Sequence, residues 1–538
     1  MNRLKITMTK KQETMKKHLF KTRLLSFAAL CGIALTFASC AKEDVAQNTT
    51  GTEGDNDKNL TTFVAGDEAK TRTSLDYNSS DFYWEAGDYI YVKDDNGDLK
   101  KSTNAPTSKV ASFNYKVPGK FGASASYKVY YLGKNSSGNS VTISTNQTQT
   151  APDNTEHFGT AGDYGTATAT GSVGGKVFSF QLEHHPAYLV FQPYTSNTIL
   201  QSCKLTKVEV TSDNDIAETY TVNTSTGALT GSAGSKQIVL TTSGSSSNPN
   251  GFPLTNNSAS VTTNGAYMVI KPGTHTLRVR YWVKYVAAGT WGVIREGTIT
   301  KIYPSTAYAS NTYYDMTADL NVKDYDGDHY YMWDAQQQYW YGHEWWSANK
   351  DQPVLNDYSN GNYAQNSTDP RYYNTSFPGR YISNPAIHSC KDLPNVNEMT
   401  WYAAKGDPRW DADELWITMG HLYQGGMWFK KKANISGFNP NTAEDGTDWR
   451  TNVNVRSWSV SQTLPDAADA GNYFYLPALG YYTSDSGQLS EVGNYGSYWS
   501  SSAFTLTSNA AYHLLFYSGR VVVSTLSRNL GLRAEALQ

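Results

Sequence analysis

The sequence predicts a mainly β protein with three folded domains behind an export signal, the last of them α+β. Three observations carry this prediction. Apolar and polar residues alternate along much of residues 60–323, which is typical of half-buried strands. Clusters of Gly, Ser, Asn and Thr separate the alternating runs and predict loops. After Asp324 the alternation fades, and 11 of the 14 Trp lie beyond it, which indicates a domain of a different kind.

Composition limits the classes of protein to which the chain can belong. Its 538 residues include 45 basic and 48 acidic side chains, and aromatic residues make up 13%. Residues 1–40 hold eight of the basic and one of the acidic side chains, so the rest has a net charge of −10. This balance disfavours nucleic acid as a partner, because phosphate binding needs a basic surface. The four cysteines, Cys31, Cys40, Cys203 and Cys390, are too dispersed for a disulfide framework or a zinc site.

The first 40 residues predict an export signal. A basic stretch from Lys16 to Arg23 precedes an apolar run, Leu24 to Ala38, that is too short to span a bilayer comfortably. The run ends in Phe37-Ala38-Ser39-Cys40, which resembles the lipobox of bacterial lipoproteins. This resemblance implies that Cys40 becomes the lipidated first residue of the mature chain. The alternative is an ordinary cleaved signal in which the cysteine is incidental.

The segment after Cys40 predicts surface display on a tether. Lys42, Glu43 and Asp44 resemble the export signal of surface lipoproteins in Gram-negative bacteria that build fimbrillin pili. Residues 41–59 are rich in Asn, Thr, Gly and Asp, which is typical of a flexible linker. We therefore expect a lipid anchor in the outer membrane, with the protein exposed at the cell surface.

The sequence predicts two β-sandwich domains, at residues 60–173 and 174–323. Leu277, Val279 and Tyr281 alternate with charged residues in the pattern of a half-buried strand, and shorter runs repeat this pattern along both segments. The glycine-rich stretch at residues 171–175 marks the expected boundary. Paired β-sandwiches are the simplest architecture that buries so many short alternating strands.

Several motifs in these two domains resemble the fimbrillin family. They are Thr71-Arg72-Thr73, Phe82 to Val92, Leu182 to Phe191, and Ala217 to Tyr220 with Thr226 to Leu229. The resemblance implies two transthyretin-like β-sandwich domains and a role as a pilus subunit or related surface lipoprotein. It also implies assembly with other pilus subunits by donor-strand exchange.

The same resemblance suggests where the chain is processed. In pilus-forming members a surface protease cuts after a basic residue and frees the first strand, whose groove then takes a strand from another subunit. Here Leu60–Val64 is the expected removable strand, and Lys70 and Arg72 are the candidate cleavage points. The alternative is that Arg72 is an exposed residue that is never cut.

Residues 324–538 predict a loop-rich α+β domain with two short helical stretches. Asn397 is the expected N-cap of a helix over residues 398–405, and Asp411 or Asp413 is expected to start a helical turn through Trp416. Further motifs resemble the bacterial major paralogous domain family, which is related to the C-type-lectin-like fold. They are Leu393-Pro394 with Asn397-Glu398-Met399, Leu476 to Gly480, Gly496 to Ser501, and Arg528 to Arg533.

Aromatic side chains of this domain are candidates for ligand binding. Trp345, Trp346 and Trp428 are expected to reach the surface, where indole rings can stack on sugar rings, whereas most other Trp are expected in the core. The calcium-dependent sugar motifs of animal C-type lectins are absent from the sequence. The acidic run Asp324 to Asp328 lacks the remaining ligand spacing of a calcium loop, so a polar linker is favoured. We expect no metal site and no cofactor.

The sequence favours an adhesin over an enzyme. It contains no nucleophile elbow, zinc-protease motif or phosphate loop, and its acidic pairs are equally explained as a solvated loop face. The predicted function is a pilus tip or accessory adhesin whose C-terminal domain binds a glycan or protein on a host or bacterial surface. The alternative is a lipid-anchored glycan-binding protein that never enters a pilus.

Overall fold

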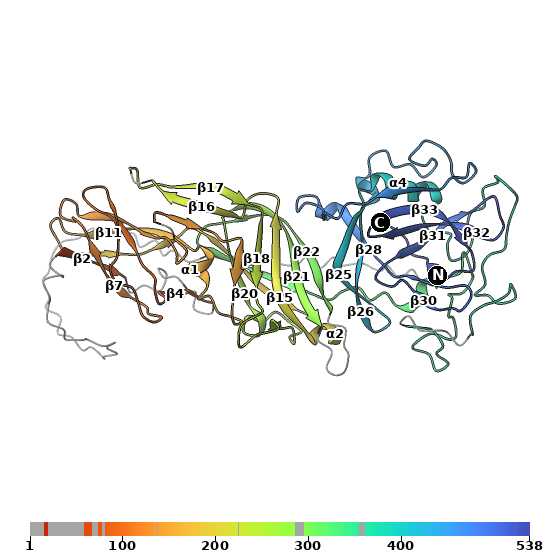
Figure 1. The fold of residues 1–538 in the computed structure, drawn as a ribbon, viewed down its shortest axis with the longest axis horizontal. Coiled ribbons are helices and arrows are strands. Elements are labelled where there is room, and N and C mark those ends of the chain that lie inside the picture. The colour runs from red at the N-terminus through yellow and green to blue at the C-terminus, as the bar shows by residue number, and fades with distance from the viewer. Residues whose placement is uncertain are drawn as a thin grey trace, which may run out of the picture.

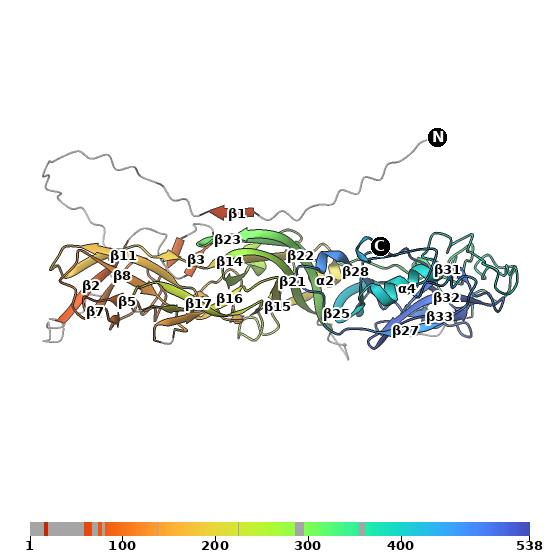
Figure 2. The same cartoon turned by 90° about the horizontal axis from the view of Figure 1, so that it is seen from above.

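The computed structural model describes residues 16–19, 59–66, 74–77, 81–136, 138–223, 225–285, 295–354 and 361–538. The protein is mainly β, and its three units lie in a row in chain order (Figures 1 and 2). Among the residues described, no helix is both long and apolar enough to cross a bilayer. The thiols of Cys203 and Cys390 are free and buried.

The first unit is one sheet that curls around an aromatic core. Its strands are β2 (Leu60–Ala65), β5 (Tyr91–Lys93), β6 (Leu99–Lys101), β7 (Phe113–Pro118), β8 (Ser126–Tyr131), β11 (Gly165–Gly171), β12 (Val177–Phe180) and β13 (Glu183–His184). They run in the order β6-β5-β8-β11-β12-β2-β7, with β13 beside β11. The rings of Phe63 on β2 and Tyr127 on β8 lie 6.5 Å apart although two strands separate β2 from β8, so the sheet folds over itself. A hairpin, β3 (Ser74–Asp76) and β4 (Asp81–Tyr83), follows β2.

The second unit has two sheets that pack face to face. One sheet holds β23 (Thr312–Asp319), β14 (Ala187–Tyr194) and β20 (Ala266–Ile270). The other holds β10 (Asn146–Thr148), β18 (Gln237–Thr241), β15 (Cys203–Ser212), β21 (Gly273–Tyr285) and β22 (Arg295–Tyr308), with β19 (Phe252–Pro253) beside β15. The ring of Phe191 on β14 meets that of Tyr281 on β21 at 6.0 Å across the core. A smaller sheet joins β9 (Ser140–Thr142), β16 (Ala217–Val222) and β17 (Leu229–Ser235).

The chain passes between the first two units more than once. The predicted boundary at residues 173/174 falls between β11 and β12, and β12 still pairs with β2 of the first sheet. Earlier in the chain, β9 pairs with β16 and β10 pairs with β18, both strands of the second unit. These crossings tie the two units together, because removing either one would leave unpaired strands in the other.

One strand lies inside the predicted signal segment. β1 (Lys16–Leu19) pairs antiparallel with β23 and occupies the outer edge of the β23-β14-β20 sheet. If the signal is cleaved after residue 39, this pairing is lost and the edge of β23 is open.

The third unit combines two sheets with long loops. Its six-stranded sheet holds β24 (Tyr330–Tyr331), β34 (Leu532–Arg533), β31 (Gly496–Ala503), β32 (Ala510–Tyr517), β33 (Arg520–Ser527) and β27 (Arg456–Ser459). Strands β25 (Arg409–Thr418), β26 (His421–Lys430) and β28 (Tyr473–Pro477) extend the large sheet of the second unit, and β29 (Tyr481–Tyr482) pairs with β30 (Leu489–Ser490). The expected helical turn at Asp411 or Asp413 was wrong, because these residues lie in β25, which is held by β26.

Within the described ranges, helices are few and short. The α-helices are α1 (Phe158–Ala161), α2 (Thr198–Gln201), α3 (Val261–Asn264) and α4 (Val396–Lys405), and the 3-10 turns are Gly327–His329, Lys432–Asn434 and Ala470–Asn472. The predicted helix of the third unit is confirmed as α4, but its N-cap is Asn395 rather than Asn397. Asn395 accepts the N–H of Glu398, and the Glu398 carboxylate accepts the N–H of Asn395 in return.

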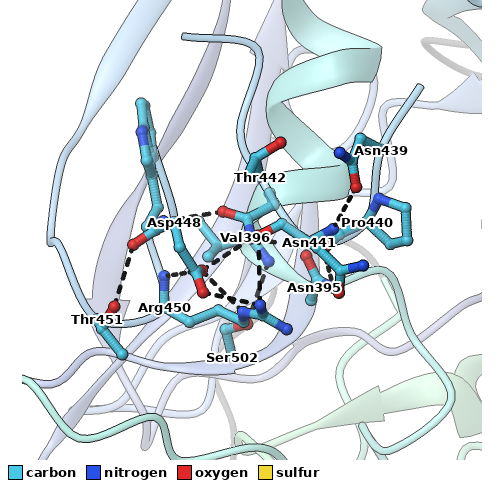
Figure 3. Close-up of polar contacts among 12 residues, drawn as sticks. Asn395, Val396, Asn439, Pro440, Asn441, Thr442, Asp448, Arg450, Thr451 and Ser502 are labelled. Atoms are coloured by element: carbon cyan, nitrogen blue, oxygen red, sulfur yellow. Dashed lines mark hydrogen bonds and ion pairs between the residues drawn. The ribbon is translucent and has the colours of Figure 1, made fainter. Parts of the chain in front are cut away.

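The side chain of Asn397 is bound elsewhere, which explains why it does not cap α4. It is buried, its Nδ2 donates to Asp448 at 2.9 Å, and its Oδ1 accepts the N–H of Trp449. Figure 3 shows that Asn395 at the start of α4 donates to Pro440 of the loop that follows residue 438, and that Arg450 donates to Asp448 within this loop. The N–H of Val396 donates to Ser502 of β31.

Candidate functional site

Strand β2 is the element that the predicted strand exchange would replace, and it lies inside its sheet. On one side it runs parallel to β12, with Thr62 opposite Val177 and Ala65 opposite Phe180. On the other side it runs antiparallel to β7. Because β2 has a partner along both edges, its removal would expose two facing rows of backbone donors and acceptors rather than one.

The inward side chains of β2 fill the core between the neighbouring strands. Thr61, Phe63 and Ala65 are buried, in strict alternation with half-buried residues. The Phe63 ring stacks on Phe178 at 5.4 Å and meets Phe121 edge-on at 5.1 Å. Loss of a buried phenylalanine ring of this kind costs about 3–5 kcal/mol in a packed core. The place of Phe63 is therefore an apolar pocket that a replacement strand must fill.

The predicted processing and export residues lie outside the described residues. This group comprises Cys40, Lys42, Glu43, Asp44, Lys70 and Arg72. The structure describes the chain up to Gly66, whose N–H donates to the Phe180 carbonyl, and again from Ser74 of β3. Lys70 and Arg72 thus belong to the segment that connects β2 to β3.

Trp345 and Trp346 form a pair on the third unit. Their rings meet edge-on with centroids 5.9 Å apart, and Trp346 is 52% exposed. Trp345 is half-buried, packs against the core of the third unit and donates its backbone N–H to Gln352. Trp346 therefore exposes aromatic surface to solvent beside the half-buried Trp345, as an aromatic contact surface requires.

Trp428 lies elsewhere, at the joint between the second and third units. Its indole N–H donates to Asp411 at 3.1 Å, and its ring lies 5.0 Å from that of Tyr475. Together with Arg278 and Thr300 of the second unit it lines a small apolar pocket. The structure thus groups Trp345 with Trp346 and places Trp428 among the residues that join two units.

Charged groups whose role at this joint the sequence did not predict lie across it. Arg280 of β21 donates to Asp411 of β25 at 2.8 Å, and both side chains are buried. Glu414 accepts the Thr298 hydroxyl at 3.0 Å and both the hydroxyl and the N–H of Thr300. These residues are more than 100 positions apart in the sequence, so no local pattern could pair them.

The acidic run at the start of the third unit gathers three possible ligand groups. Asp326, Asp328 and His329 place one ligand atom each within 4.8 Å of one another. His329 lies 3.2 Å from Asp326 and 2.5 Å from Asp328, so the imidazole already pairs with both carboxylates. Asp324 instead forms a backbone bridge with Ile417. The polar-linker interpretation of this run stays a prediction.

Comparison with solved structures finds similarity to proteins that are described as cell-adhesion or fimbrial proteins. No family model matches the chain, and no curated protein matches it. One solved structure, provisionally described as a cell adhesion protein from Bacteroides ovatus, has 13% identity and a TM-score of 0.30, covering 48% of this chain and 91% of that chain. A similarly described protein from Bacteroides uniformis has 18% identity and a TM-score of 0.29, covering 50% and 94%. A fimbrial protein from Bacteroides vulgatus has 12% identity and a TM-score of 0.25, covering 49% and 96%.

Proposed function

We propose that this chain is a surface lipoprotein that acts as a pilus tip or accessory adhesin and assembles by strand exchange. The observation that supports the proposal is the position of β2. This strand pairs with a neighbour along each edge, and its Phe63 fills the aromatic core. Lys70 and Arg72 follow it within a few residues, so one cut there would separate β2 from the rest of the chain.

The chemistry of the exchange follows from the vacated groove. Without β2, the backbone groups of β12 and β7 would lose their protein partners, and the apolar pocket of Phe63 would be exposed to water. A strand from another subunit with alternating apolar residues would pair with both edges and refill the pocket.

The remaining parts of the proposal rest on the sequence. The first two units are transthyretin-like sandwiches, and the third is a C-type-lectin-like domain that binds a host or bacterial surface glycan or protein. Cys40 carries a lipid that anchors the protein in the outer membrane, and Lys42, Glu43 and Asp44 direct it to the cell surface. The chain has no enzymatic activity and needs no cofactor.

A second function is favoured by one observation, the half-exposed Trp346 beside Trp345. In this alternative the chain stays anchored by its lipid, keeps β2 in place and binds glycans without entering a pilus.

The test of strand exchange uses the chain from residue 41 onward and a trypsin-like protease. We expect a cut between β2 and β3, identified by mass spectrometry, and none there in the Lys70→Ala/Arg72→Ala double variant. The cut protein should take up a fluorescent peptide with the sequence of residues 60–65, and a peptide carrying Phe63→Ser should bind at least ~10-fold more weakly, since it leaves the ring pocket empty. Absence of the cut, or equal uptake by uncut protein, would contradict the proposal and favour the alternative.

A further inference from the structure

The third unit contains a polar cavity that the sequence did not predict. It has a volume of about 290 Å³ and is lined by Asp334 and Gln336, residues 367–370 and 372–375, and His388. All of these residues lie in the long stretch between β24 and α4. In Figures 1 and 2 the loops of this stretch, green to teal, run over the end of the third unit that faces away from the first two.

The wall of the cavity is fixed by a buried carboxylate. Asp334 has a left-handed φ of +53° and accepts the N–H groups of Ile387 at 2.8 Å and His388 at 2.7 Å. It also accepts the Asn374 side-chain amide at 2.7 Å. Asp334 therefore joins three separate segments of the lining, so the cavity exists before any ligand arrives.

A buried arginine also contacts this wall. Arg528 is fully buried, lies 4.3 Å over the ring of Trp333, and donates through Nη1 to the carbonyls of Asn374 and Ser376. Its Nη2 has no hydrogen-bond partner within the part of the chain that the structure describes. Burial lowers the pKa of Arg528 to about 10, so the guanidinium is charged at neutral pH.

The chemistry of the lining favours a neutral ligand rich in hydroxyl groups. Tyr372 and Tyr373 stack with their ring centroids 4.4 Å apart and supply aromatic surface at one side. Around them lie amide, hydroxyl and imidazole groups, including Gln336, Thr368 and His388, which can both donate and accept. The one lining carboxylate besides Asp334 is Asp369, and Arg371 neutralises it through a pair of hydrogen bonds.

We propose that this cavity binds a neutral saccharide of one or two rings. Its volume lies near the lower end, ~300 Å³, of small-molecule sites. The tyrosine faces would receive the C–H side of a sugar ring, and the side chains of Thr368 and His388 would bond its hydroxyl groups. The inference rests on the proposed function, because it names the ligand class of the domain that the adhesin presents. The lining of the cavity does not include Trp345 or Trp346.

The test is saturation-transfer NMR on the chain from residue 41 onward with D-galactose, D-mannose, N-acetyl-D-glucosamine and lactose. We expect transfer to at least one of these sugars at ~1–10 mM and at least ~10-fold weaker binding by Tyr373→Ala. Thr368→Val, at an exposed position, is the second variant should Tyr373→Ala fail to fold. Tyr341→Ala is the matched control, since this tyrosine of the same stretch is 53% exposed and lies outside the lining.

Three results would overturn this inference. They are no transfer to any of the four sugars, unchanged binding by a folded cavity variant, and loss of binding by Trp346→Ala alone. The last would place the sugar on the tryptophan pair. Failure of strand uptake in the protease test leaves these results unaffected, so the two proposals fail separately.

Discussion

At the scale of single residues, burial distinguishes the aromatic side chains that form the core from those that reach the surface. Trp333, Trp340, Trp416, Trp449 and Trp499 are fully buried and Trp410 is 7% exposed, so six of the eleven Trp of the third unit are buried, as expected of most of them. Composition could predict this because a loop-rich domain with few aliphatic residues has little else to bury. It could not separate Trp346, which is exposed, from Trp428, because the contacts of Trp428 with Asp411 and Tyr475 form only when distant parts of the chain meet.

His513 is a buried group that makes the third unit sensitive to acid. Burial lowers the pKa of His513 to about 3, below its value of 6.5 in an unfolded chain, and its Nδ1 lies 3.2 Å from the Ser497 hydroxyl. Its contribution to stability is therefore complete above pH 6.5 and is lost as the pH falls toward 3. Between pH 7 and pH 5 the loss amounts to about 2 kcal/mol.

We predict that His513→Gln reduces this pH dependence. The glutamine does not titrate, so the melting temperature of the variant should fall less between pH 7 and pH 5 than that of the unaltered chain. Differential scanning calorimetry at several pH values measures it. Thr507→Gln is the control, because it changes an exposed position and removes no titratable group. Parallel curves for His513→Gln and the unaltered chain would refute the argument.

At the scale of elements, the start of α4 connects the helix to two other parts of its unit. Asn395 caps the helix and also donates from Nδ2 to the Pro440 carbonyl at 3.0 Å. The type and extent of α4 were predictable from Glu398 near its start and Gly406 at its end. Which asparagine caps it was not, because Asn395 and Asn397 have equal capping ability and only the buried loop at Asp448 draws Asn397 away.

We predict that Asn395→Ala lowers the free energy of unfolding of the third unit by about 1 kcal/mol, while Asn395→Ser retains most of it. Serine can accept the Glu398 N–H, whereas alanine cannot. Asn397→Ala should cost about 1–3 kcal/mol although it caps nothing, since it leaves the buried N–H of Trp449 unpaired. Urea unfolding measures all three. A larger loss for Asn395→Ser than for Asn395→Ala would exclude Asn395 as the cap.

At the scale of the whole molecule, one large sheet runs from the second unit into the third. β22 and β25 pair in parallel where Thr298 meets Glu414, which joins β21 and β22 to β25, β26 and β28. Arg280 and Asp411 form a buried ion pair across the same joint. Backbone pairing together with buried charges makes the joint an ordered contact rather than a loose linker.

Glu414 makes this joint depend on pH. Burial, together with the negative charge of Asp411, raises the pKa of Glu414 to about 7 from 4.5. The folded chain therefore binds a proton more tightly than the unfolded chain between these values. The stability that Glu414 contributes is present at pH 4.5 and is lost as the pH rises through about 7.

We predict that Glu414→Gln strengthens the joint at pH 8 and has little effect at pH 5.5, because glutamine resembles the protonated acid. Hydrogen–deuterium exchange of peptides that cover β22 and β25 should slow in the variant at pH 8, relative to the unaltered chain. Glu156→Gln, at an exposed site in the first part of the chain, serves as the control. Faster exchange in Glu414→Gln at pH 8 would show that the ionised carboxylate stabilises the joint.

The sequence by itself determined those features of the fold that depend only on residues close together in the chain. The alternation around Tyr281 predicted a strand, the residues around Glu398 and Gly406 predicted a helix, and the shift of Trp beyond Asp324 predicted a third domain of different character. Hydrophobic periodicity and capping act within a few residues, so they can be recognised before folding is known.

Tertiary structure alone decided which distant residues meet. It placed β2 between β12 and β7, paired Glu414 with Thr298, and gathered Asp334, Tyr373 and His388 around one cavity. Each contact spans tens to hundreds of residues, and whether it forms depends on how the sheets close. Local sequence carries no signal for such closure, because the same alternating strand is compatible with many neighbours.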